Sequence, residues 1–177
     1  GVLTISGGEF TAANNGTYGI FGYGGGTEKG GSFTITGGTF KGSVATDSNY
    51  PCLPIVSGGN FTDKETVSDY FPSDQSLTVD SNGNIVANTT QSQARIGSTY
   101  YKTIADAISA AKANDTVVIV NSFSIDMTNV QPNNGAITID KDITLDGNGK
   151  TITATGTKPS GSTHVILVTV NGASVEN

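Results

Sequence analysis

Short segments in which apolar and polar residues alternate make up much of the chain, and three of these segments repeat one pattern. They read LTISGGEFTA from Leu3, FTITGGTFKG from Phe33 and PIVSGGNFTD from Pro54. Alternation with a period of two is typical of a β-strand. The double glycine predicts a sharp bend, because glycine tolerates positive φ without a steric penalty. Each copy is therefore predicted to be a strand that bends and returns an aromatic side chain to the interior.

Corresponding residues of the three copies fall into columns. The columns are Ile5, Ile35 and Val56; Gly7-Gly8, Gly37-Gly38 and Gly58-Gly59; and Phe10, Phe40 and Phe61. A unit of about 20–30 residues cannot bury its apolar face alone, whereas stacked units can. We therefore predict coils stacked along an axis, with corresponding strands paired in parallel about 4.8 Å apart. An antiparallel sandwich, with chance similarity between the copies, is the alternative.

The second half has one convincing helical pattern, at 103–113. Ile104, Ala107, Ile108 and Ala111 are spaced to form an apolar stripe, and Thr103 is a suitable N-cap residue. Further strands are predicted at 117–120, 137–139, 143–145 and 151–153. We interpret the helix as a cap over the first layer of a second stack of coils.

These elements divide the chain into three parts. Residues 1–63 are predicted to end one β-helix stack, and 93–177 to begin a second one with its capping helix at 103–113. Residues 64–92 are predicted to be a cap with a short helix and a β-hairpin at Asn82-Gly83, followed by a linker. Both chain ends read as strands, so we expect a segment of a longer protein.

The segments ISGGEFT, ITGGTFKG, YGIFGYGGG and VSGGNFTD resemble the repeats of large cell-surface, adhesin-like proteins of gut bacteria, mostly of Gram-positive type. The stretch from Tyr101 to Thr153 resembles the same family. The resemblance implies a pectin-lyase-like right-handed parallel β-helix, all-β apart from the capping helix. It also implies an extracellular or cell-surface location in a bacterium. The repeats are specific for a fold and not for an activity.

Charge narrows the range of partners. The net charge is −6, and the basic residues are scattered, which disfavours nucleic acids and anionic membrane surfaces. No apolar run approaches the ~20 residues that span a bilayer, so no membrane insertion is expected. Cys52 is the sole cysteine, which excludes an intramolecular disulfide.

The densest group of carboxylates is Asp140, Asp142 and Asp146. Oxygen ligands of this kind suit Ca²⁺, but turn chemistry explains all three residues equally well. By resemblance, a lyase would need a positioned arginine or lysine base, and a pectin hydrolase would need clustered aspartates with a Gly-His-Gly stretch. The single arginine, Arg95, and the single histidine, His164, do not fit these patterns. No catalytic residues and no cofactor are therefore predicted.

Aromatic residues beside the repeats are the remaining candidates for a site. Tyr18, Tyr23 and Tyr50, with Phe21, are predicted as a glycan-binding surface, because a ring can pack on the apolar face of a sugar. The alternative is that these rings pack into the core and loops.

We expect a non-catalytic structural or adhesive module of an exported bacterial surface protein that contacts host or dietary glycans. The alternative is a fragment of a β-helix polysaccharide lyase or hydrolase whose active coils lie elsewhere. Head-to-tail self-association through open coil ends is a further hypothesis.

Overall fold

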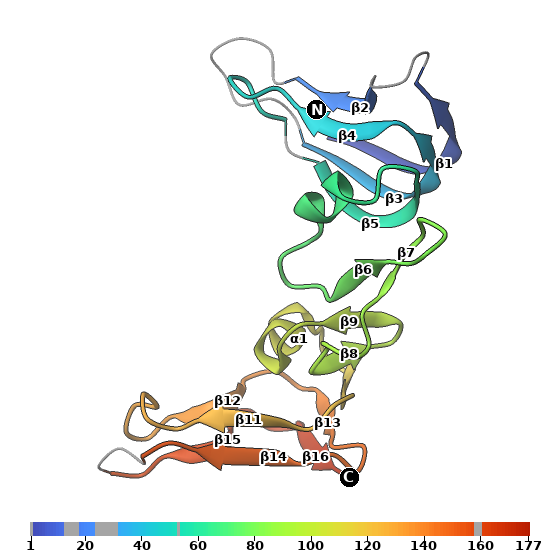
Figure 1. The fold of residues 1–177 in the computed structure, drawn as a ribbon. Coiled ribbons are helices and arrows are strands. Elements are labelled where there is room, and N and C mark those ends of the chain that lie inside the picture. The colour runs from blue at the N-terminus through green and yellow to red at the C-terminus, as the bar shows by residue number, and fades with distance from the viewer. Residues whose placement is uncertain (1, 13–17, 24–31, 53, 158–160) are drawn as a thin grey trace. The chain divides into compact units, whose positions relative to one another are not determined.

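A computed structural model describes residues 2–12, 18–23, 32–52, 54–157 and 161–177. The chain forms two compact units, residues 1–73 with 77–87 and residues 74–76 with 88–177. The first contains β1 (Val2–Thr11), β2 (Tyr18–Gly22), β3 (Ser32–Lys41), β4 (Ser43–Thr46), β5 (Pro54–Phe61), the 3₁₀ helix η1 (Thr66–Tyr70), β6 (Leu77–Val79) and β7 (Ile85–Ala87) (Figure 1). The second contains β8 (Ala94–Ile96), β9 (Thr99–Tyr101), α1 (Ile104–Ala110), β10 (Thr116–Ile119), β11 (Phe123–Asp126), β12 (Gly135–Ile139), β13 (Thr144–Asp146), β14 (Ile152–Thr155), β15 (His164–Val168) and β16 (Ser174–Glu176).

Strands β1, β3 and β5 form a parallel sheet in the predicted register at their apolar residues. The register shifts at the double glycines, where Gly37 faces Ser6 and Gly58 faces Thr36, so the predicted glycine column is offset. Ile5 lies beside Ile35, and Ile35 beside Val56. The rings of Phe10 and Phe40 stack with centroids 4.9 Å apart, and those of Phe40 and Phe61 with centroids 4.6 Å apart. The antiparallel alternative is therefore wrong, and the predicted columns of like side chains are confirmed.

The two glycines of each repeat have different roles. The second glycine has positive φ in every copy, at 102° in Gly8, 104° in Gly38 and 112° in Gly59, a conformation that side chains disfavour. In the second and third copies, the first glycine admits the backbone of the preceding coil. A Cβ atom on Gly37 would lie 2.4 Å from the carbonyl oxygen of Ser6, and one on Gly58 would lie 2.3 Å from that of Thr36. The doublet thus permits both the bend and the close stacking.

Strands β6 and β7 form the predicted antiparallel hairpin, which covers β5, the last coil of the first unit. The amide of Phe61 donates to the carbonyl of Gly83, and the Asn60 side chain donates to the carbonyl of Asn82. Helix η1 buries Val67 in the same core. These contacts satisfy polar groups that an uncovered strand would leave unpaired.

Three sets of parallel strands build the coils of the second unit. They are β10, β13 and β16; β11 and β14; and β12 and β15. Strands β8 and β9 form an antiparallel pair, and β8 continues the sheet beside β10. The chain is therefore an all-β parallel β-helix whose described residues include one short α-helix and a β-hairpin cap.

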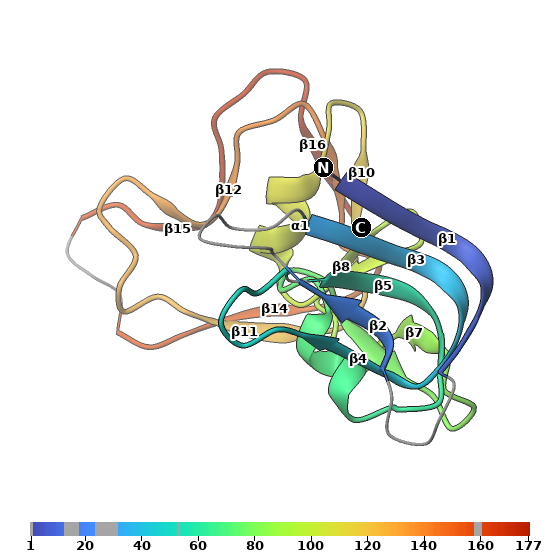
Figure 2. The same cartoon turned by 90° about the horizontal axis from the view of Figure 1, so that it is seen from above.

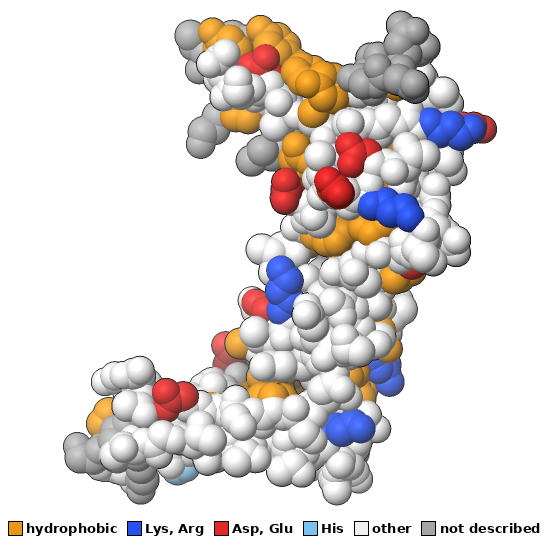
Figure 3. Space-filling view, viewed as in Figure 1, with side chains coloured by type: hydrophobic (Ala, Val, Ile, Leu, Met, Phe, Trp, Pro, Cys, Tyr) orange, Lys and Arg blue, Asp and Glu red, His pale blue; other side chains and the backbone are white. Residues whose placement is uncertain are grey.

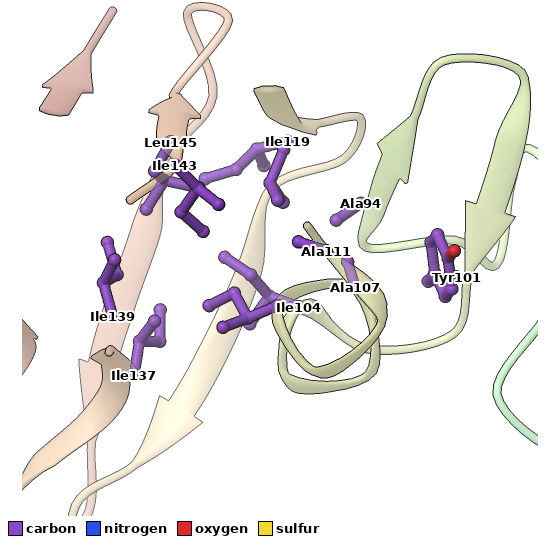
Figure 4. Packing of buried hydrophobic residues seen from close by; sticks show 12 residues of the cluster. Ala94, Tyr101, Ile104, Ala107, Ala111, Ile119, Ile137, Ile139, Ile143 and Leu145 are labelled. Carbon is purple, nitrogen blue, oxygen red and sulfur yellow. The ribbon is translucent and has the colours of Figure 1, made fainter. Parts of the chain in front are cut away.

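Helix α1 covers the core of the second unit, as predicted. Its stripe of Ile104, Ala107 and Ile108 is buried in one cluster with Ile119, Ile137, Ile139, Ile143 and Leu145 (Figure 4). Thr103 is the N-cap, and its hydroxyl accepts from the amide of Asp106 over 3.1 Å. At the other end, the Lys141 ammonium donates to the carbonyls of Ile108, Ser109 and Ala111. Lys141 thereby satisfies carbonyls that have no partner within the helix. None of the helices in the described ranges has the length and apolar character needed to cross a membrane.

Replacement of Phe40 by alanine should lower the free energy of unfolding by about 3–5 kcal/mol, because it leaves a cavity between two stacked rings. Phe40 is fully buried, whereas Phe10 is only half-buried. Phe10→Ala should therefore lower it by less than half as much. Urea unfolding followed by circular dichroism measures both. An equal loss of unfolding free energy in the two variants would contradict an arrangement in which Phe40 lies between two rings and Phe10 contacts one.

Replacement of Lys141 by methionine should destabilise the second unit by about 1–3 kcal/mol, because three helix carbonyls lose a charged donor. The matched control is Lys112→Met, which removes an exposed lysine near the same helix end. Amide hydrogen exchange in α1 should quicken in the first variant and stay unchanged in the second. Equally fast exchange in both variants would contradict this role of the Lys141 hydrogen bonds, because loss of any nearby positive charge would then have the same effect.

The hairpin should weaken in acid because of Asp80. Its carboxylate accepts from the side chain of Asn84 and from the amides of Asn84 and Asn82. These bonds hold the pKa of Asp80 below its ordinary value of 3.8. A depressed folded pKa means that the stabilisation is complete above the ordinary value and is lost as pH falls through the folded one.

The difference in melting temperature between the unaltered chain and Asp80→Asn should therefore be largest at neutral pH and shrink below about pH 4. Asp69→Asn, at an exposed position on η1, serves as the control and should show little effect at either pH. A melting-temperature difference that increases as the pH falls would contradict the predicted role of the Asp80 carboxylate.

Candidate functional site

Four aromatic side chains lie exposed on the outer surface of the first unit. Tyr18 is 50% exposed, Phe21 46%, Tyr23 58% and Tyr50 38%. These values exclude burial of the rings in the core, whereas Tyr50 does lie in a loop and pack against Tyr23. We call these four residues the aromatic row. Hydrophobic side chains are visible at the surface of this unit near β1 and β2 (Figure 3).

Strand β2 directs the rings of Tyr18 and Phe21 outward, and Tyr23 follows directly after its end. Ile20 packs against the core and Gly22 is buried, so Phe21 and Tyr23 occupy the outer positions of the alternation. Gly22 must be small, because a Cβ atom there would lie 2.2 Å from the carbonyl oxygen of Cys52. The pairing of β2 with β4 shifts register between Tyr18 and Ile20. This irregularity places Tyr18 on the same side as Phe21.

The rings of the row contact one another in two pairs. Tyr18 and Phe21 have centroids 5.0 Å apart at an interplanar angle of 34°. Tyr23 and Tyr50 meet edge to face, with centroids 5.8 Å apart. In the next coil the partners of Tyr18 and Phe21 are Ser43 and Ala45. These small residues leave the flanks of the rings open.

The loop that holds Tyr50 is fixed by side-chain hydrogen bonds. The Asp47 carboxylate accepts from the amides of Asn49 and Tyr50, each over 2.8 Å. The Thr46 hydroxyl accepts from the amide of Cys52 over 2.9 Å and donates to the carbonyl of Gly22 over 3.0 Å. These bonds tie the loop to β2. The backbone at Tyr50 is therefore held in place by the hydrogen bonds of its own loop.

Sequence reasoning selected the tyrosines but not the residues that position them. Thr46 and Asp47 begin the stretch TDSNYP, in which Asp and Asn are typical of a turn that bonds to its own backbone. That signal was sufficient to predict an ordered loop. It did not indicate that the loop would lie beside β2.

The predicted calcium candidates do not form a cluster. The described residues contain no group of three or more His, Cys, Asp or Glu side chains that could hold a metal ion. Asp146 accepts from the amide of Asn148 over 2.7 Å, as a turn residue does. Asp142 lies against Gly172, where a Cβ atom would be 2.6 Å from its carboxylate oxygen.

Asp140 lines a hollow of about 330 Å³ between α1 and β12. Lys141 also lines this hollow, and its positive charge disfavours a cation there. Arg95 donates to the carbonyl of Gly97 over 2.9 Å, and His164 is exposed at the start of β15. The aromatic row is thus the best-defined candidate site in the described part of the chain.

Comparisons with protein-family models, curated proteins and solved structures found no match to this chain.

Proposed function

We propose that this chain is a non-catalytic structural and adhesive module of an exported bacterial surface protein, and that the aromatic row binds glycans. One observation supports the proposal above all others. Four rings, in two contacting pairs, are exposed on a coil whose core is formed by other residues. Exposed apolar groups of this size on a folded protein commonly mark an interaction site.

The chemistry of the row suits a neutral sugar. A tyrosine offers an apolar face and a hydroxyl group, and a pyranose offers an apolar C–H face and several hydroxyls. The loop at 46–52 adds the exposed polar residues Ser48 and Asn49. Neither the row nor this loop contains lysine or arginine, so an acidic polysaccharide would find no counter-charge in these residues.

The β-helix supplies the structural part of the proposed role. Stacked coils form a scaffold in which each coil contacts its neighbours, and such scaffolds grow in one direction as coils are added. The row is mounted on β2 and on a loop that is hydrogen-bonded to it, and a site on such supports is more precisely placed than one on a free loop. The module would therefore hold its binding surface at a fixed place along a spacer.

The proposal is tested by measuring the binding of the whole chain to an array of neutral and acidic glycans that includes pectins, alginates and mucin glycans. We expect binding to neutral glycans, and Phe21→Ala or Tyr23→Ala should weaken it about tenfold, since a lost ring contact is worth about 1 kcal/mol or more. Tyr23→Phe, which keeps the ring, should lose less.

Tyr100→Ala, at a tyrosine of the second unit, is the matched control and should bind as the unaltered chain does. An array without binding would overturn the adhesive part of the proposal. Release of reducing ends or of unsaturated sugars from any of these polysaccharides would overturn the non-catalytic part.

A further inference from the structure

Strand β1 is the outer strand of its sheet, with β3 as its neighbour (Figure 2). A free strand edge pairs readily with another chain, and proteins usually block it with proline, lysine, a short length or a cover. Strand β1 is ten residues long and contains neither proline nor lysine. Its one charged residue, Glu9, forms an ion pair with Lys41 of β3. Within the part of the chain that the structure describes, this edge therefore has none of the usual protection.

The contacts of Gly7 within the structure do not require a glycine at this position. In the inner coils the corresponding residues, Gly37 and Gly58, must be glycine because a carbonyl oxygen of the coil above would contact any Cβ atom. Around Gly7 nothing lies within 4 Å of the place where a Cβ atom would be. Its φ is also outside the positive region that requires glycine. Glycine is needed here only if another backbone passes over β1.

The apolar side chains of β1 give a second, independent indication. Leu3 is 57% exposed, whereas Phe33 directly below it is 6% exposed. Phe10 has one ring face on Phe40 and is half-buried, while Phe40 lies between two rings and is fully buried. The other end of the same sheet differs, because the β6–β7 hairpin covers β5. The unpaired edge of β1 thus presents the same kinds of side chain as the interface between two stacked coils, but without the second coil.

We propose that the free edge of β1 binds a parallel β-strand with the pattern apolar–polar–Gly–Gly–any residue–Phe. The residue before the glycines would lie over Gly7, and the phenylalanine would stack on Phe10. The chain itself shows that this pattern fits, because β1 sits in this way on β3, and β3 on β5. Addition of a strand to a sheet edge is an established mode of recognition, in which main-chain bonds give affinity and alternate side chains give specificity.

The probe is a synthetic peptide with the sequence of residues 31–42, GSFTITGGTFKG, titrated into the whole isotope-labelled chain and followed by NMR. Saturable shifts should be confined to β1 and its neighbours, with contacts between the phenylalanine after the peptide's glycines and Phe10. A peptide of the same composition in scrambled order should not bind. Shifts spread over both units, or none at millimolar peptide, would overturn the proposal.

The decisive variant is Gly7→Val, whose side chain would obstruct an incoming backbone. Because the space around Gly7 is open, the thermal unfolding of this variant should match that of the unaltered chain, while peptide affinity should fall at least about tenfold. Thr4→Val, an exposed position on the same strand, is the control and should keep full affinity. Equal affinity in all three proteins would contradict the proposed register.

Sedimentation of the same proteins without peptide tests whether a second copy of the chain occupies the edge of β1 instead. If the chain self-associates through β1, if Gly7→Val abolishes this association, and if the peptide does not compete, the occupant is a second copy and the proposed strand pattern is wrong. A monomer that binds the peptide supports the proposal. Glycan binding by the aromatic row is independent of every one of these outcomes.

Discussion

The structure depends on one constraint, which is that no single coil can keep its own apolar side chains away from water. Ile35, Phe40 and Val56 reach almost complete burial only because a coil of the same shape lies next to them. Burial of this kind is the main favourable contribution to folding. Parallel stacking in register is the solution that repeated sequences permit, since each residue then meets its own counterpart.

The double glycine makes this stacking possible at the bend. One glycine takes a backbone conformation that side chains disfavour, and the other leaves room for a carbonyl oxygen of the adjacent coil. With the interior filled in this way, the outer positions of β2 are free of any packing role. The described residues of the first unit therefore present three distinct surfaces: the last coil covered by the hairpin, an outer face with the aromatic row, and the edge of β1, which pairs with no other described strand than β3.

Much of the fold could be predicted from the sequence, because period-two alternation and repeated columns are local signals. The columns through Phe40, the hairpin at Asn82-Gly83 and the helix after Thr103 all follow from them. Strand β4 was not predicted, because its four residues include a single buried apolar side chain, Val44, and its pairing with β2 is what makes it a strand. Strand β11 was also missed, although Phe123 and Ile125 alternate with polar residues.

The candidate site was less predictable than the fold. The sequence indicates which residues are aromatic, but the direction of Tyr18 depends on a register shift, and the position of Tyr50 depends on a loop that bonds to β2. Both are tertiary effects.

The most direct test of like-on-like stacking is an NMR measurement of proton contacts between the phenylalanine rings of the first unit. The account predicts contacts between Phe10 and Phe40 and between Phe40 and Phe61, none between Phe10 and Phe61, and backbone contacts of parallel pairing. Contacts that skip Phe40, or an antiparallel pattern between β1 and β3, would contradict it.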